Sequence, residues 1–254
     1  MSARPDPKRK GDAKLRRTNW HRRLTLLCVL AVSLSGVLFS GRAEAFPPYR
    51  STDADTADPG TVELRLGLIR VERDGGHDTV STPLLRLNLG LPGHAELVSE
   101  FEYVPREGRL GDAAIGAKWV PFRGTPAVGV EALALLPVRE DDRGLGFEGQ
   151  IVTTLPRRDV VLHVNGGGFY DARPTVPEAG WRASALVEVP LEGFRPGLEA
   201  FAKQEFGKGV DGRTGLGMIV NLGRFDLRAG LHAGVTREAP DFVVSFWIAT
   251  KFAP

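Results

Sequence analysis

The sequence predicts a single antiparallel transmembrane β-barrel of about twelve strands that follows a cleavable signal peptide. Three observations predict this all-β fold. The N-terminus has the features of a secretory leader, and the rest of the chain is a series of segments in which apolar and polar residues alternate. The last of these segments, 241–252, ends almost at the C-terminus. Alternation with a period of two is the pattern of a strand with one apolar and one polar face.

Residues 1–45 have the composition of a signal peptide. A basic stretch ending at Arg23 precedes an apolar run over 24–39, and Ala43-Glu44-Ala45 is a small-x-small cleavage site. The run of about 16 residues is short for a membrane helix. We therefore expect cleavage before Phe46 and export to the outer membrane, with a retained N-terminal anchor as the alternative.

The leader also carries the positive charge of the chain. It contains 10 Lys and Arg against 3 Asp and Glu, so that 23 basic and 28 acidic residues remain in the mature chain. This net negative charge argues against a nucleic-acid partner. The only cysteine, Cys28, lies in the leader, and a mature chain without cysteine is compatible with an oxidising periplasm.

After the leader, residues 46–60 are rich in Pro, Asp, Ser and Thr and are expected to form a periplasmic N-terminal tail, and 61–254 to form the barrel. Alternation is clear in Leu85–Leu91, in Ala95–Tyr103 and in Phe225–Val235. Short turns such as 91–93 are expected at the periplasmic end, and longer charged loops such as 171–180 at the outer end.

A soluble β-protein would show the same alternation, so other features must separate the two. The segments are about 9 to 12 residues long, which matches tilted strands that cross a bilayer rather than the shorter strands of soluble proteins. Their number is even, as in outer-membrane barrels. The polar faces are rich in charge and glycine and are expected to lack the large aliphatic residues on which a second sheet would pack.

Two segments resemble a known family. Asp53–Leu64 and Gly111–Trp119 are similar to the opening and to a Gly-Asp-x-x-x-Gly-x-Lys strand of the outer-membrane barrel family of the MetA pathway of phenol degradation. The resemblance implies a transporter-type barrel, suggests hydrophobic or aromatic compounds as solutes, and brings no catalytic residues. In one departure, Phe252 is followed by Ala253-Pro254, whereas barrels recognised by the barrel-assembly machinery usually end on an aromatic residue.

No catalytic site, metal site or cofactor is expected. A barrel enzyme would need a nucleophile and a base, and no Ser and His fall at matching heights on adjacent strands. His77 and Asp78 lie in a loop and are expected to be solvated. The glycines of 166–168 precede a strand rather than a lysine and a helix, so they do not form a phosphate loop.

The polar faces provide the candidate functional residues, which are expected to line the lumen. They are Glu96, Glu100, Glu102, Asp112, Lys118, Glu131, His163, Arg182, Glu188, Lys203, Glu205, Arg228 and His232. Lumenal charges need countercharges or water, so they either plug a structural barrel or line an aqueous path.

The sequence therefore predicts a passive channel or uptake barrel for small, hydrophobic or aromatic molecules, surrounded by outer-membrane lipids. A structural barrel with a plugged lumen and a soluble periplasmic β-protein that binds an apolar ligand are the alternatives. In an open lumen, an acidic stripe of Glu96, Glu100, Glu102 and Asp112, opposite or beside Lys203 and Arg228, would favour cations.

Overall fold

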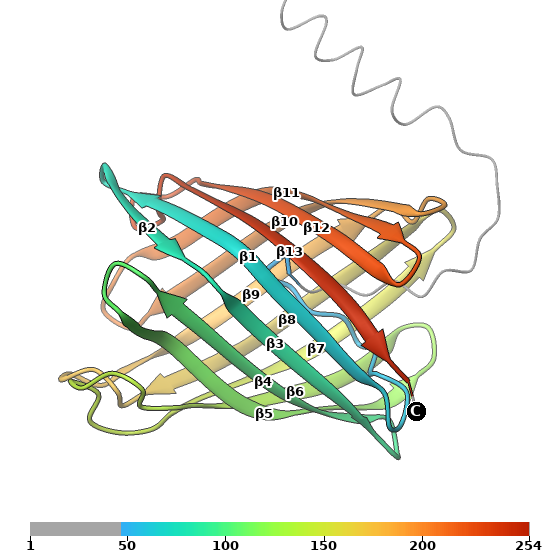
Figure 1. The fold of residues 1–254 in the computed structure, drawn as a ribbon, viewed down its shortest axis with the longest axis horizontal. Coiled ribbons are helices and arrows are strands. Elements are labelled where there is room, and N and C mark those ends of the chain that lie inside the picture. Colours follow the sequence, from blue (N-terminus) through green and yellow to red (C-terminus); the bar gives the residue numbers. More distant parts are fainter. Residues whose placement is uncertain (1–46, 254) are drawn as a thin grey trace, which may run out of the picture. The chain divides into compact units, whose positions relative to one another are not determined.

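The computed structural model describes residues 47–253 and is all-β (Figure 1). The strands are β1 (Val62–Asp74), β2 (His77–Ser81), β3 (Leu84–Leu91), β4 (Ala95–Val104), β5 (Arg109–Arg123), β6 (Ala127–Leu135), β7 (Gly146–Arg157), β8 (Val160–Asp171), β9 (Glu178–Glu188), β10 (Phe194–Glu205), β11 (Val210–Leu222), β12 (Phe225–Gly234) and β13 (Phe242–Phe252). Among these residues no helix is long and apolar enough to cross a membrane.

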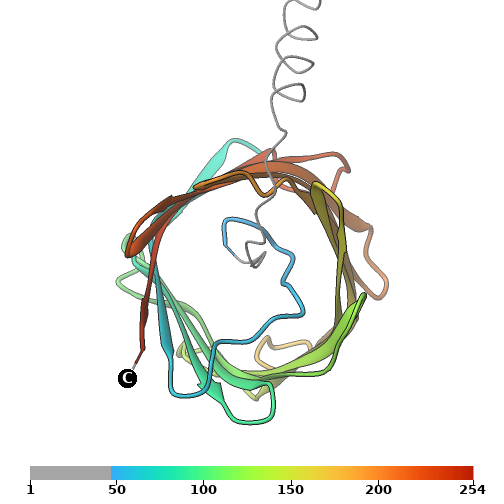
Figure 2. The ribbon, with the colours of Figure 1, turned by 90° about the vertical axis from the view of Figure 1, so that its right-hand side faces the viewer.

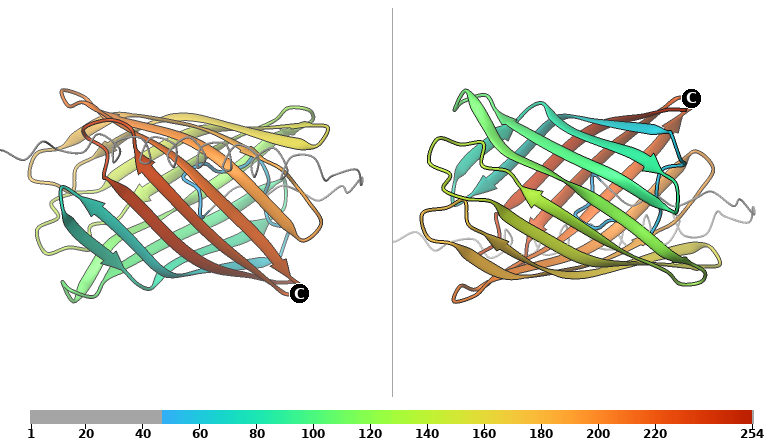
Figure 3. Two further views of the ribbon diagram at one scale, coloured as in Figure 1. Left: turned by 90° about the horizontal axis from the view of Figure 1, so that it is seen from above. Right: turned by 90° about the horizontal axis from the view of Figure 1, so that it is seen from below.

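The sheet closes into a barrel. From β3 to β13 each strand pairs antiparallel with the next, and β1 pairs with β13 from Val62 opposite Phe252 to Arg73 opposite Phe242. β2 and β3 pair with successive parts of β1 and are separated only by Thr82 and Pro83. They therefore occupy one position in the wall, which makes a twelve-strand barrel. Figure 3 shows the tilted strands on both sides. The predicted all-β barrel of about twelve strands is confirmed. The predicted signal peptide, 1–45, lies outside the described residues.

Side chains alternate between the two faces of this wall. On β12, Leu227 and Leu231 are exposed on the outside, whereas Arg228 and His232 are buried on the lumen side. Other outward residues are also large and apolar, including Leu97, Ile115, Ile151, Leu198, Leu216 and Phe246. The outside of the barrel is thus apolar and the inside is mostly polar.

The connections define two ends of the barrel. The turn end holds the short links that begin after Leu91, Arg123, Arg157, Glu188 and Leu222, together with the start of β1 and the end of β13. The loop end holds the links after Asp74, Val104, Leu135, Asp171, Glu205 and Gly234, of which 136–145 and 235–241 are the longest.

Residues 47–60 are expected from the sequence to form a periplasmic tail, but this stretch runs inside the barrel. Figure 2 shows this stretch, in blue, within the ring of strands. We call it the lumenal segment. Ser51, Thr52, Asp53 and Ala54 are all at most 5% exposed. A composition rich in Asp, Ser and Thr is also typical of a solvated tail, but here the lumen wall supplies the hydrogen-bond partners that water would otherwise provide.

Candidate functional site

The lumenal segment crosses the barrel interior near the turn end. It leaves the wall where Gly60 donates its N–H to the Gly90 carbonyl, at 2.9 Å. At its other end the Pro47 carbonyl accepts a hydrogen bond from Arg228 on β12, at 3.4 Å. The segment therefore spans from β3 to β12 and has polar contacts with strands around most of the circumference.

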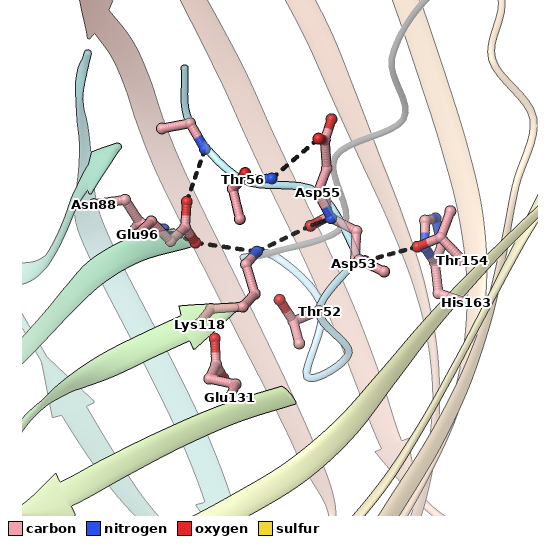
Figure 4. A network of polar contacts seen from close by, with 12 residues as sticks. Thr52, Asp53, Asp55, Thr56, Asn88, Glu96, Lys118, Glu131, Thr154 and His163 are labelled. Atoms are coloured by element: carbon pink, nitrogen blue, oxygen red, sulfur yellow. Dashed lines mark hydrogen bonds and ion pairs between the residues drawn. The ribbon is translucent and has the colours of Figure 1, made fainter. Parts of the chain in front are cut away.

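Lys118 is the central contact between the wall and this segment (Figure 4). Its ammonium lies 3.2 Å from Asp53 of the segment and 3.0 Å from Glu96 of β4, and the side chains of all three residues are at most 2% exposed. Glu96 also accepts hydrogen bonds from the Ala57 N–H, at 2.9 Å, and from the Asn88 amide, at 2.7 Å. A buried cation between two carboxylates thus holds the segment against β4 and β5.

A second contact is formed by Glu199 on β10. Its two carboxylate oxygens accept the N–H groups of Arg50 and Ser51, at 2.9 and 2.5 Å. His232 of β12 contacts the same carboxylate at 2.7 Å. Consecutive backbone donors to one buried carboxylate hold the segment in a defined register on the wall.

Thr154, His163 and Glu188 form a third contact, with the connectivity of a nucleophile, a base and an acid. The Thr154 hydroxyl lies 2.9 Å from His163 Nδ1, and His163 Nε2 lies 3.2 Å from Glu188. The Thr154 oxygen accepts the Ala54 N–H at 2.8 Å, and the whole chain of residues is buried. Because the segment covers the hydroxyl, this arrangement serves to bind Ala54 rather than a substrate.

Apolar contacts complete the docking of the segment and correct one expectation. Tyr49 packs with Leu186 and Ile219, so the lumen face does contain large aliphatic residues near the turn end. They pack on the segment rather than on a second sheet. Gly197 and Gly217 provide the space for Tyr49, because a Cβ added at either position would overlap its ring.

Above the segment, toward the loop end, the lumen contains a cavity of about 330 Å³, which we call the loop-end cavity. Residues 47–52 are among its lining and form its floor, and Phe169, Phe201 and Trp247 contribute aromatic surface. The mouth of this cavity is lined by residues that include Arg50, Glu102, Asp112 and Lys203. The lumen is therefore hollow at the loop end and filled by the segment below.

The cavity wall is covered by ion pairs. Arg86 pairs with Glu100 and with Glu131, which lies at 3.1 Å. Arg70 pairs with Glu102 at 3.1 Å. Within the predicted acidic stripe, Glu100 and Glu102 therefore pair with Arg86 and Arg70, and not with Lys203 and Arg228 as expected from the sequence.

Three further ion pairs involve Arg182 and Arg173. Arg182 pairs with Glu148, and Arg173 of the loop after β8 pairs with Asp112 at 2.5 Å and with Asp171 at 2.8 Å. Burial alone would lower the pKa of Arg173, but its hydrogen bonds to Asp171 and Asp112 raise that pKa above the usual value. This guanidinium stays charged and joins the loop to two strands.

Arg50 and Lys203 differ from these cations. The Arg50 guanidinium lies over the Phe201 ring, 5.7 Å from its centroid, and the Lys203 ammonium lies 4.3 Å from the centroid of Phe169. Burial lowers the pKa of Arg50, and the positive charges of Arg70 and Arg213 act in the same direction. Both side chains reach the cavity and its mouth.

The predicted site residues fall into three groups. Those that contact the lumenal segment or lie buried around it are Glu96, Lys118, His163, Glu188, Arg228 and His232. Those that line the loop-end cavity are Glu100, Glu102, Asp112, Glu131, Arg182 and Lys203. Glu205 belongs to neither group, because it pairs with Lys208 at the β10–β11 hairpin, at 2.6 Å.

Sequence reasoning missed several residues of the interior, namely Arg50, Asp53, Glu63, Arg65, Arg70, Arg86, Glu148, Glu199 and Arg213. For the missed residues that lie on strands, the alternation of polar and apolar residues indicates the lumen face. Glu199 alternates in phase with Lys203, and Glu63 and Arg65 alternate with Leu64 and Leu66. For Arg50 and Asp53 the sequence contains no such periodicity. In the part of the chain that the structure describes, no cluster of residues is arranged to hold a metal ion.

Comparisons with known proteins bear on the fold alone. No protein-family model matches the chain and no curated protein does, so the resemblance to the phenol-degradation barrels is not confirmed. Among solved structures, the NanC porin is similar over 76% of this chain and 100% of its own, with a TM-score of 0.56 and 10% identity. The translocator domain of the autotransporter NalP from Neisseria meningitidis covers 95% of this chain and 98% of its own, with a TM-score of 0.47 and 10% identity.

Proposed function

We propose that the protein is an outer-membrane barrel that takes up small molecules passively through its lumen, and that the lumenal segment obstructs the path until it moves. The observation that carries this proposal is that the turn end of the lumen is filled by residues 47–60 rather than by wall side chains alone. A wall side chain cannot leave the interior of a folded barrel, but a segment attached to the wall at one end can.

The outer surface supports a location in the membrane. Leu97, Ile151, Leu216 and Leu231 are each between 46% and 63% exposed on the outward face. An apolar outer band over charged interior residues is the arrangement of outer-membrane barrels. We therefore propose that lipids of the outer membrane surround the barrel and that the barrel-assembly machinery inserts it after signal-peptide cleavage.

The loop-end cavity supports the uptake of small organic molecules. Its volume of about 330 Å³ and its aromatic residues Phe169, Phe201 and Trp247 suit a ring-sized solute. A solute would enter from the loop end, contact these rings and pass the turn end after the segment is displaced. No covalent chemistry or cofactor takes part in this mechanism.

The first alternative is a structural barrel in which the segment stays in place. The buried contacts of Lys118 with Asp53 and Glu96 favour it, because releasing the segment would separate these charges. The soluble ligand-binding alternative is opposed by the apolar outer surface, and it predicts extraction into buffer without detergent.

The test is conductance in planar bilayers with three forms of the mature chain. One form begins at Phe46, the second lacks residues 47–57, and the third carries a Gly-Ser stretch of equal length in place of 47–57. Deletion to 57 retains the Asp58 carbonyl that accepts the Thr61 N–H at 2.9 Å.

We expect rare, brief openings from the intact chain and sustained current from the two altered forms. The Gly-Ser form keeps the length of the segment but not its specific contacts, so it shows which of the two losses causes the current. Absence of current from all three forms would reject uptake in favour of the structural barrel. Equal, sustained current from all three would reject the obstructing role of the segment.

A further inference from the structure

Every carboxylate of the loop-end cavity and its mouth has an arginine partner. Those lining the cavity and its mouth all pair with arginine: Glu100 and Glu131 with Arg86, Glu102 and Glu72 with Arg70, Glu148 with Arg182, Asp112 and Asp171 with Arg173, Asp211 with Arg213 and Glu107 with Arg109. Six arginines serve these nine carboxylates, because Arg70, Arg86 and Arg173 each pair with two, so a ligand that enters the cavity meets carboxylates that are paired and compensated in part.

Two cations of the same cavity have no such compensation. Among residues 47–253, no carboxylate lies within ion-pair distance of the Arg50 guanidinium or of the Lys203 ammonium. Each lies over an aromatic ring instead, Arg50 over Phe201 and Lys203 over Phe169. Phe201 and Lys203 are two residues apart on β10 and so share the lumen face.

A ring face satisfies a cation only in part. Stacking occupies the face of a guanidinium and leaves its N–H edges available, and an ammonium has three donors of which a ring engages few. Both cations therefore retain donors toward the cavity. Arg182 reinforces the local positive charge, because it also lies over Phe201, at 5.9 Å, and donates to the Arg50 carbonyl at 3.4 Å.

We propose that the loop-end cavity binds a small organic carboxylate, with its anionic group between Arg50 and Lys203 and its apolar part against the aromatic lining. The inference rests on the proposed function, in which this cavity is the entrance of the uptake path. It also differs from the cation preference expected from the sequence, because Glu100 and Glu102 pair with Arg86 and Arg70, whereas Arg50 and Lys203 have no carboxylate partner among residues 47–253. A neutral solute would leave these donors unused, and a cation would be repelled by them.

The test is isothermal titration of the mature protein in detergent micelles with three ring compounds of similar size: benzoate, benzyl alcohol and protonated benzylamine. We expect measurable heat of binding for benzoate and at least tenfold weaker binding of the other two. Arg50→Gln and Lys203→Gln should each weaken benzoate binding about tenfold or more, since each removes one charged donor. Added salt should weaken binding of benzoate to the unaltered protein.

Matched controls use cations outside the cavity. Arg73→Gln removes an arginine paired with Asp78 at 2.6 Å, and Lys208→Gln removes a lysine of the β10–β11 hairpin that is 59% exposed. Neither should change benzoate affinity. The heat-dependent gel mobility of folded barrels checks the folding of every variant. A variant that binds weakly because it is unfolded is thereby identified.

Equal affinity for benzoate and benzyl alcohol would overturn the inference, as would unchanged benzoate affinity in both cavity variants. Binding in micelles does not require passage, so the two proposals fail separately. Benzoate binding without conductance in any form of the chain would retain the site and reject uptake. Conductance without benzoate binding would retain uptake and reject the carboxylate site.

Discussion

Replacement of Lys118 by methionine should release the lumenal segment. Lys118 is fully buried and is the cation that faces both Asp53, at 3.2 Å, and Glu96, at 3.0 Å. Methionine has a similar length and no charge, so the change leaves two buried carboxylates near each other without this cation. Breaking a buried ion pair by removing one partner costs about 3–5 kcal/mol.

The protein can avoid this cost by moving Asp53 into water. Release of the segment would break the hydrogen bonds that Arg50, Ser51, Ala54 and Ala57 donate from their backbone N–H groups. At about 1–2 kcal/mol net for each of these bonds, they hold the segment by roughly 4–8 kcal/mol. A loss of about 3 kcal/mol therefore raises the population of the released state roughly a hundredfold, because every 1.4 kcal/mol is a factor of ten.

Two measurements check this prediction. The frequency of openings in planar bilayers should rise about a hundredfold in Lys118→Met. Trypsin should cleave after Arg50, the only basic residue between Phe46 and Val62, and N-terminal sequencing should then begin at Ser51. Lys208→Met serves as the control and should change neither measurement.

The double variant Asp53→Asn with Lys118→Met removes one of the two carboxylates that faced Lys118 and should restore part of the closed behaviour. The reasoning would be refuted if Lys118→Met lost 3–5 kcal/mol of unfolding free energy in urea while openings and trypsin cleavage stayed unchanged. In that case the segment would be a fixed part of the barrel.

Three further predictions concern the membrane face, the docking of Tyr49 and export. Leu231→Arg should lower the unfolding free energy in micelles by roughly 2–4 kcal/mol, the cost of a charge on the lipid face, and a smaller effect than Leu231→Ala would reverse the assigned faces. Gly217→Ala should displace Tyr49 and raise trypsin cleavage, whereas Gly166→Ala, where a Cβ meets nothing within 4 Å, should not; equal cleavage in both would contradict the packing argument. N-terminal sequencing of the membrane-fraction protein should begin at Phe46, because Ala43-Glu44-Ala45 fits the signal peptidase, and recovery of Met1 would contradict this.

Strand periodicity accounts for how much of the fold is predictable from the sequence. Alternation such as Leu227, Arg228 and Ala229 fixes both the strand and its two faces, and consecutive antiparallel pairing follows from short turns. The interior is predictable only in part. Phase places Glu96 and Lys118 on the lumen face, but ion-pair partners depend on the strand register and on shear, so Glu100 pairs with Arg86 rather than with the cations expected.

The lumenal segment was not predictable by the same reasoning. Residues 47–60 have no period, and their Pro, Asp and Thr content is the same as that of a solvated tail. What determines their position is complementarity with residues distant in sequence, such as Glu199, which is 148 residues from Ser51. A pattern within one segment does not contain this information.

The placement of the lumenal segment has a consequence for how the protein folds. All strand pairs except β1–β13 and β1–β3 join strands that follow each other along the chain, and β1 and β3 are separated only by β2, so the wall can form hairpin by hairpin with short loop closures. The contacts of the segment span 100 residues at Thr154 and 149 at Glu199. They require strands from both halves of the wall to be in position, and this long loop closure makes them late steps. Completion of folding and obstruction of the lumen are therefore the same event, and a barrel still being assembled would be the most permeable form of this protein.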